Sequence, residues 1–299
     1  MHILSFGEIL WDIIEGHEFL GGAPLNFSVS AQRLGNTAHL ISSVGNDRLG
    51  LCALERMKDL CLDTSLIRTL QEAPTGVAIA KKYPNGDCKF EIPRPAAFDS
   101  LHVEPSQLRQ LCELDPEWIY FGTLAQTCAE NETLLSEILL RLPKARRFYD
   151  INLRHGHWNL PLVQRLSSLA TIIKLNEEEA ELLFAAKVGD QPFSIESFCR
   201  HWSVHHGPRF VCVTRGKWGC SIWREDELKD FEGYPVSVTD TVGAGDAFSA
   251  ALLHGIQMSW PMDQTAAFAN AAGAIVASRA SATPDWSLEE CLTMIARGK

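Results

Sequence analysis

The sequence lacks the motifs that identify several large classes of nucleotide-binding and metal-binding proteins. Its 299 residues contain no G-x-x-x-x-G-K-[ST] run and no protein-kinase signature, which excludes a P-loop enzyme and a protein kinase. The nine cysteines stand singly, without a C-x-x-C pair, and the ten histidines form neither H-E-x-x-H nor a zinc-finger pattern. Single cysteines in odd number are typical of free thiols in a reducing compartment, so we expect a cytoplasmic protein.

Positive charge is also scarce. The chain has 27 Lys and Arg against 37 Asp and Glu, a formal net charge of −10, and no long basic stretch. This balance argues against nucleic acid as a partner. The N-terminal stretch MHILSFGEILWDII is too short and too acidic for a signal peptide or a membrane span, so we expect no membrane partner.

The chain does contain a regular alternation of strand-length apolar runs and helical segments. This rhythm predicts an α/β fold with a mostly parallel sheet and helices on both faces. No repeat or linker divides the chain, so we expect a single domain over residues 1–299. Asp47 is a candidate helix cap, and Ser287 with Glu290 forms a capping box. We expect strands over 2–6, 38–44, 117–122, 146–152, 170–175, 209–214 and 220–224, and helices over 24–34, 47–60, 131–142, 161–169, 245–256, 263–278 and 287–296.

One segment interrupts this rhythm. Residues 75–92 contain two alternating strands around the turn Pro84-Asn85-Gly86-Asp87, which predicts a β-hairpin. A hairpin between βα units does not easily join a parallel sheet, so we expect a small lid that pairs with LWDII or EFLGG and covers a ligand. We place this lid at about residues 11–22 and 73–98. Its strand edges also offer a surface through which two copies could pair as a homodimer.

The stretch DTVGAGDAF, residues 240–248, places a carboxylate where a glycine-rich turn enters a helix. Two interpretations are open. An Asp at a helix start caps the helix by accepting backbone N–H bonds at the positive end of the dipole. Alternatively, the N–H groups of Gly243, Ala244 and Gly245 bind a phosphate, and Asp246 stands beside it as a base.

Several further motifs accompany this one. GGAPLNFS lies near the start and DTVGAGDAFSAALL near the end, with SVGNDRLG, DINLR, KLNEEEAELL and VTRGKWG between them. With these motifs in this order, the sequence resembles the ribokinase-like (PfkB) carbohydrate kinase family over essentially its whole length. The resemblance implies a ribokinase-like three-layer αβα sandwich with a mostly parallel sheet and a small β lid. It also implies an ATP-dependent sugar kinase whose small-molecule partners are the sugar and ATP.

The resemblance favours the second interpretation of the glycine-rich turn. Asp246 would then be the catalytic base for a sugar hydroxyl, and the turn would be the anion hole for the transferred group. Glu179 would support Mg²⁺ through water, and Asp240 with Val242 would hold a monovalent cation such as K⁺. At the nucleotide the resemblance places Asn176, Thr214, Gly216, Gly219 and Asn270. At the sugar it places Asp12, Gly21, Gly22, Asn26, Arg94, Asp150, Asn152 and Arg154.

Most of these residues also have structural interpretations. Asn176 and Glu179 form a helix-start pattern, in which Asn176 caps and Glu179 reaches back to it. Residues 214–219 can be a plain turn between strands, Asn270 an interior helix residue and Arg94 a solvated side chain.

The sugar is indicated by GEILWD, GGAPLN and DINLRHGHW, which look most like the fructokinase branch. That similarity implies phosphorylation of fructose to fructose 6-phosphate. A 2-keto-3-deoxygluconate kinase shares the D-x-N-x-R pattern and is the main alternative, followed by another sugar kinase of the family. A non-catalytic, kinase-like regulatory protein is a remote alternative.

Overall fold

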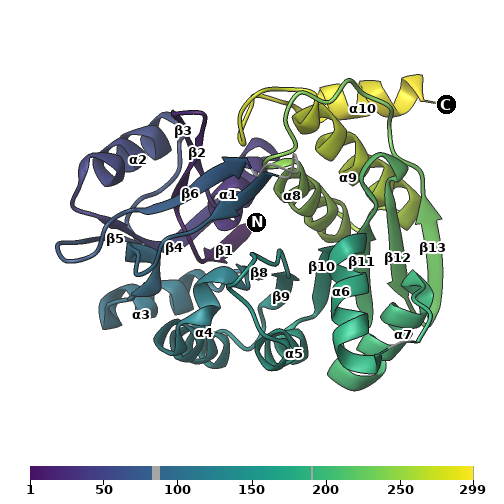
Figure 1. Ribbon diagram of the computed structural model, residues 1–299, viewed down its shortest axis with the longest axis horizontal. Helices are drawn as coiled ribbons and strands as arrows, with labels where there is room; N and C mark the ends of the chain where they lie inside the picture. Colours follow the sequence, from purple (N-terminus) through teal and green to yellow (C-terminus); the bar gives the residue numbers. More distant parts are fainter. Residues whose placement is uncertain (83–87, 190, 299) are drawn as a thin grey trace. The chain divides into compact units, whose positions relative to one another are not determined.

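The computed structural model describes residues 1–82, 88–189 and 191–298 (Figure 1). The chain forms two compact units. The first comprises residues 1–145 and 154–157, and the second comprises residues 146–153 and 158–299. The fold is α/β, with a large, mostly parallel sheet flanked by helices, which confirms the predicted fold class. None of the helices within the described ranges is both long and apolar enough to cross a membrane.

The first unit contains parallel strands in the order β8-β1-β4-β5. Ile3 of β1 pairs with Ala38 on one side and with Trp118 on the other. Because helices cover these strands, β1 and β8 are apolar runs that are almost fully buried. Its elements are β1 (His2–Phe6), β4 (Thr37–Gly45), β5 (Ile67–Leu70), β8 (Trp118–Gly122), α1 (Ala23–Arg33), α2 (Arg48–Asp59), α3 (Pro105–Leu114), α4 (Ala129–Arg141) and the 3₁₀ turns η1 (Ala97–Asp99) and η2 (Leu124–Thr127).

A separate four-stranded sheet belongs to the same unit. It has the order β3-β2-β6-β7, formed by β2 (Leu10–Ile14), β3 (His17–Gly21), β6 (Gly76–Lys82) and β7 (Cys88–Glu91). β2 pairs antiparallel with β3 and parallel with β6, and β6 pairs antiparallel with β7. The pairing of the predicted hairpin strands with LWDII is thereby confirmed. The turn at residues 84–87 lies outside the described residues, and the role of this sheet as a lid stays a prediction.

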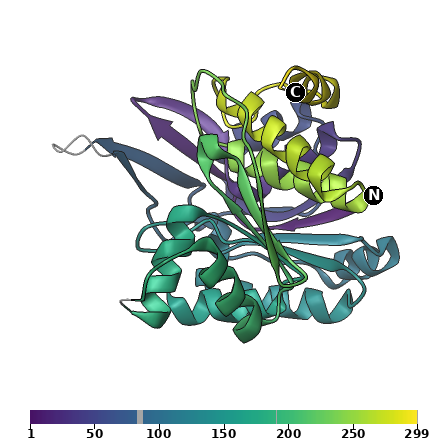
Figure 2. The ribbon, with the colours of Figure 1, turned by 90° about the vertical axis from the view of Figure 1, so that its right-hand side faces the viewer.

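The second unit contains strands in the order β13-β12-β11-β10-β9. β9, β10 and β11 are parallel, and β12 and β13 continue antiparallel. Figure 2 shows α6 and α7 on one face of these strands and α8 and α9 on the other. The elements are β9 (Arg146–Asp150), β10 (Ile172–Asn176), β11 (Phe210–Thr214), β12 (Cys220–Arg224), β13 (Glu227–Phe231), α5 (Leu160–Leu169), α6 (Glu177–Val188), α7 (Ile195–His206), α8 (Ala244–Gln257), α9 (Met262–Ala277), α10 (Leu288–Arg297) and the 3₁₀ turn η3 (Gly216–Trp218).

The observed elements differ from the sequence prediction in a few places. The strand predicted over 146–152 ends at Asp150, because Asn152 adopts a left-handed φ of 43° that a strand cannot continue through. β5, α3, α7 and β13 were not predicted. The capping box of Ser287 and Glu290 at the start of α10 is confirmed.

Asp47 joins α2 to the segment between β5 and β6. Its Oδ1 accepts hydrogen bonds from Gly50 N at 2.8 Å and from Thr75 Oγ1 at 2.7 Å, and its Oδ2 accepts one from Thr75 N at 2.8 Å. Asp47 is therefore the helix cap, as predicted. Burial raises the pKa of Asp47, but the hydrogen bonds from Thr75 and Gly50 outweigh it, so the pKa lies below its ordinary value.

We predict that Asp47→Asn lowers the free energy of unfolding by about 1 kcal/mol at pH 7, because the amide accepts fewer of these bonds. Because the pKa of Asp47 is lower in the folded protein than in the unfolded chain, its ionised carboxylate stabilises the fold fully above the pKa in the unfolded chain, about 3.9. This stabilisation is lost as the pH falls through the pKa in the folded protein. The difference between the two proteins should therefore shrink below about pH 4. Urea unfolding at pH 7 and at pH 3 measures it. Asp59→Asn, at the other end of α2, is the control, and an equal loss in both variants would contradict the assignment.

Candidate active site

The glycine-rich turn forms the start of α8. Gly243 is the N-cap residue with φ 79°, and a Cβ atom there would lie 1.9 Å from the carbonyl oxygen of Ala282. Only glycine fits both the left-handed conformation and this close backbone approach. The turn therefore brings two distant backbone segments into contact.

Asp246 is the third residue of α8 and is only 7% exposed. The N-cap is Gly243, so Asp246 does not cap the helix as the first interpretation predicted. A carboxylate in the first turn is still favoured by the helix dipole. Ala244 N donates to the Thr241 carbonyl at 3.3 Å, which differs from the prediction of a bare N–H at this residue. Gly245 lies in the first turn, where N–H groups have no partner within the helix.

Lys174 of β10 lies next to this turn. The sequence analysis did not predict it as a site residue. A Cβ atom at Gly245 would lie 3.0 Å from Lys174 Nζ. Burial lowers the pKa of Lys174, but the carboxylates of Asp150, Glu179 and Asp246 outweigh it, so the pKa lies above its ordinary value. The signal in the sequence was a lysine inside the otherwise apolar run IIKL.

Asp150 is fully buried, which differs from its predicted contact with the sugar. Both of its carboxylate oxygens lie 3.2 Å from Lys174 Nζ, and Oδ2 lies 2.9 Å from Ser249 Oγ. The Asp150 side chain has no exposed surface, and it contacts Lys174 and Ser249. Asn152 and Arg154 follow on the loop after β9, where Asn152 is half-buried and Arg154 is exposed.

Asn176 and Glu179 form a capping box at the start of α6. Asn176 Oδ1 accepts a hydrogen bond from Glu179 N at 2.8 Å, and Glu179 Oε2 accepts one from Asn176 N at 2.9 Å. Glu179 Oε1 also accepts one from Leu153 N at 2.6 Å. Burial raises the pKa of Glu179 above its ordinary value. The structural interpretation of this motif is confirmed, and support of Mg²⁺ stays a prediction.

The described residues contain no group of three or more His, Cys, Asp or Glu side chains that could hold a metal ion by themselves. Mg²⁺ usually keeps several waters and is bound through one or two carboxylates together with substrate phosphates. Glu179 fits such a role, since each carboxylate oxygen has a second lone pair for a metal-bound water.

A pocket of about 520 Å³ opens beside the first turn of α8. Ala244 and Gly245 form part of its wall, next to the apolar side chains of Val236, Val238 and Phe248. Trp218, 66% exposed, was not predicted and adds a large aromatic surface. The pocket also contains the predicted nucleotide residues Thr214, Gly216, Gly219 and Asn270.

Asn270 has a structural role as well. Its Nδ2 donates to the carbonyl oxygens of Phe231 at 3.4 Å and Glu232 at 3.0 Å, which ties α9 to the end of β13. The structure therefore brings Asn270 to the pocket and also supports its interpretation as an interior helix residue.

The predicted cation residues lie just before the turn. Val242 N donates to Asp240 Oδ1 at 3.0 Å, and Asp240 N donates to the Ala277 carbonyl at 3.3 Å. Residues 277 and 278 thus contact residues 239 and 240, and the monovalent cation site stays a prediction.

Four of the predicted sugar residues lie close together in the first unit. Asp12 of β2 is almost fully buried, and a Cβ atom at Gly21 would lie 2.6 Å from its Oδ2. Gly22, with φ 111°, is the N-cap of α1, and its carbonyl accepts from Asn26 N at 2.9 Å. Gly21 is therefore needed to leave room for the Asp12 carboxylate.

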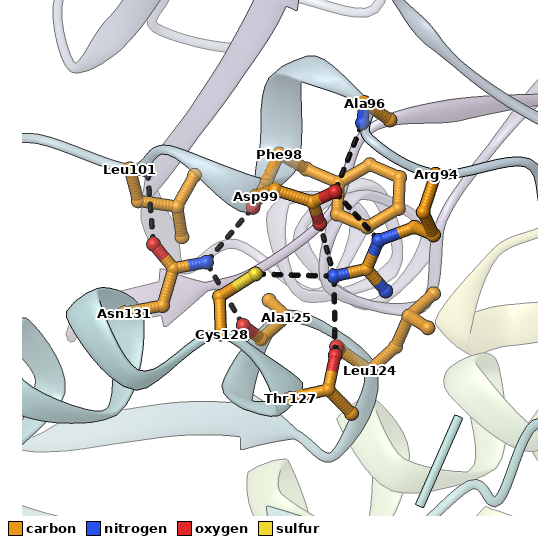
Figure 3. Close-up of polar contacts among 10 residues, drawn as sticks. All are labelled: Arg94, Ala96, Phe98, Asp99, Leu101, Leu124, Ala125, Thr127, Cys128 and Asn131. Carbon is orange, nitrogen blue, oxygen red and sulfur yellow. Dashed lines mark hydrogen bonds and ion pairs between the residues drawn. The ribbon is translucent and has the colours of Figure 1, made fainter.

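Arg94 follows β7 and is held by its own unit (Figure 3). Nε donates to Asp99 Oδ2 at 2.6 Å, and Nη2 donates to Thr127 Oγ1 at 3.1 Å and contacts Cys128 Sγ at 3.3 Å. The guanidinium lies 4.9 Å over the ring of Phe98. Most of its donors are thus used within the protein, and among the described residues Nη1 has no hydrogen-bond partner.

Comparison with known proteins gives a consistent result. The model of the pfkB family carbohydrate kinases matches residues 4–289. A fructokinase of Oryza sativa subsp. japonica is 28% identical and covers 96% of this chain and 95% of its own length. A fructokinase of Salmonella typhimurium is 28% identical over 82% of this chain and 80% of its own length. The structure of the Xylella fastidiosa fructokinase with bound ATP superposes with a TM-score of 0.85 at 22% identity, over 99% of this chain and 98% of that one.

We predict that Gly243→Ala destabilises the protein by about 3 kcal/mol or more, because left-handed strain adds to a backbone clash. Gly207→Ala is the matched control. Gly207 also has a left-handed φ, 86°, but nothing lies within 4 Å of a Cβ atom there, so strain of about 1 kcal/mol is expected alone. Thermal unfolding of both variants measures the difference. Equal stability of the two variants would show that the contact with Ala282 is unimportant.

Proposed function

Because the chain belongs to the pfkB family of carbohydrate kinases, we propose that it transfers the γ-phosphoryl group of ATP to the hydroxymethyl oxygen of fructose, giving fructose 6-phosphate. The observation that carries the donor assignment is the pocket of about 520 Å³ whose wall includes Ala244 and Gly245. A nucleotide in this pocket has its phosphates at the first turn of α8, next to Asp246. The names of the relatives support fructose as the acceptor.

The residues of the second unit can supply the chemistry of transfer. Asp246 takes the proton of the attacking hydroxyl, since an alcohol is poorly nucleophilic until that proton can leave. The N–H groups of the first turn of α8 stabilise the charge on the transferred group. Glu179 would hold a water of a bound Mg²⁺, and the ion would supply positive charge that offsets the charge of the phosphates. Trp218 and Val238 offer apolar surface to the adenine ring of the nucleotide.

Asp12 and Asn26 of the first unit would bind the sugar. A carboxylate accepts hydrogen bonds from neighbouring hydroxyls and repels an anionic substrate. One observation favours the alternative, 2-keto-3-deoxygluconate. Arg94 Nη1 is buried without a hydrogen-bond partner among the described residues, and Arg154 is exposed, so the Arg154 guanidinium could bind the carboxylate of such a substrate.

The regulatory alternative is disfavoured because a kinase-like protein without activity tends to lose its base or its glycines. Here Asp246, Gly243 and Gly245 are all in place, together with Asn176 and Glu179. The K⁺ site at Asp240 and Val242, a homodimer through the four-stranded sheet and a cytoplasmic location stay predictions.

We predict that Asp246→Asn lowers kcat by about 10³-fold, because the amide cannot accept the proton of the sugar hydroxyl. Asp263→Asn is the matched control, since Asp263 lies in the first turn of α9 and is exposed. The measurement is steady-state turnover coupled to ADP release, with thermal unfolding of both variants alongside. Near-native turnover by a folded Asp246→Asn variant would leave this carboxylate with a structural role only.

A sugar panel tests the acceptor. We predict that fructose has the highest kcat/KM among fructose, glucose, ribose and 2-keto-3-deoxygluconate. Asp12→Ala should reduce kcat/KM for fructose about 100-fold and leave the KM for ATP nearly unchanged, because only hydroxyl contacts are lost. A preference for 2-keto-3-deoxygluconate that collapses in Arg154→Ala would contradict fructose and leave the kinase assignment intact.

A further inference from the structure

Lys174 is a buried charge with no role in the steps of the proposed reaction described above. It lies in the middle of β10, and its side chain is 8% exposed. A lysine is almost never buried in this way unless it is paired, since desolvation of an ammonium costs several kcal/mol. Its partner is Asp150, which lies directly opposite on the neighbouring parallel strand β9.

The Lys174–Asp150 pair is connected to the first turn of α8. Ser249 Oγ lies 2.9 Å from Asp150 Oδ2 and 2.9 Å from the Gly245 carbonyl oxygen. The ammonium also lies next to Gly245 itself, since a Cβ atom there would be 3.0 Å from Nζ. Two routes, one through Ser249 and one by direct packing, therefore join the pair to the turn.

Lys174 lies among several acidic side chains. The carboxylates of Asp150, Glu179 and Asp246 all act on this one ammonium. A phosphoryl group at the first turn of α8 adds further negative charge to the same region. Interactions of this kind are strong in a buried environment, where water screens them little.

We propose that Lys174 is a positioning residue for phosphoryl transfer, which fixes the first turn of α8 through Asp150 and Ser249 and offsets the negative charge that the transferred group brings. The inference rests on ATP as the proposed donor. Lys174 does not touch the nucleotide; it acts through Gly245 and through the local field. Its effect should therefore be largest for the terminal phosphate.

The test compares four proteins: the native chain, Lys174→Met, the double variant Lys174→Met with Asp150→Asn, and Lys187→Met. Lys187 is the control because it lies on the exposed surface of α6. The double variant removes both charges, which a folded protein tolerates better than one unpaired charge. Calorimetry with Mg²⁺ measures binding of ADP and of β,γ-imido-ATP, and steady-state kinetics gives kcat and KM for ATP.

We expect Lys174→Met and the double variant to bind β,γ-imido-ATP about 10-fold more weakly while ADP affinity changes less than about 3-fold. We expect kcat to fall about 100-fold, with a smaller change in KM. A merely structural role would lower thermal stability without separating the two nucleotides. If Lys174→Met does not fold, the nucleotide affinities and kcat of the double variant test the role of Lys174.

Native affinity for β,γ-imido-ATP in the folded double variant would overturn the role of Lys174. If the native chain binds neither nucleotide, the donor assignment and this inference fail together. If the native chain binds both nucleotides but phosphorylates none of the sugars, only the acceptor assignment fails. The ratio of the affinities for β,γ-imido-ATP and ADP, compared between the native chain and the variants, still tests the role of Lys174.

Discussion

No side chain fits between the first turn of α8 and the backbone at Ala282, and the candidate active site depends on that constraint. The left-handed φ of Gly243 turns the chain into the helix, and Gly245, which has no side chain, follows in its first turn. The pocket beside the turn and the carboxylate of Asp246 follow from this geometry. The proposed site for a phosphoryl group would thus be made mainly from backbone, which suits a chain with a formal net charge of −10.

The two units contribute different parts of the proposed reaction. The base, the turn, the capping box of Asn176 and Glu179 and the pocket all belong to the second unit. Asp12 and Arg94 belong to the first unit, and so does Gly21, which leaves room for the Asp12 carboxylate. Within the first unit, Cys128 contacts Arg94, and burial together with the Asp99 carboxylate raises the pKa of its thiol.

Local signals allowed much of this structure to be predicted from the sequence. The capping boxes at Asn176 and Ser287 span four residues each, and the apolar runs of the parallel strands are continuous. β13 was missed because ELKDF has no apolar alternation and is held in place by its pairing with β12. The Lys174–Asp150 pair was missed because its members are 24 positions apart and meet only when β9 and β10 lie side by side.

The central claim is that the first turn of α8 receives the transferred phosphoryl group with Asp246 beside it. A crystal structure of the native chain with ADP, Mg²⁺, aluminium fluoride and fructose tests this most directly, because the fluoride occupies the position of the group in transfer. The account predicts the fluoride within hydrogen-bond distance of the backbone N–H groups of Gly243 and Gly245, and a fructose hydroxyl against the Asp246 carboxylate. A fluoride bound away from this turn, with Asp246 contacting neither ligand, would contradict it.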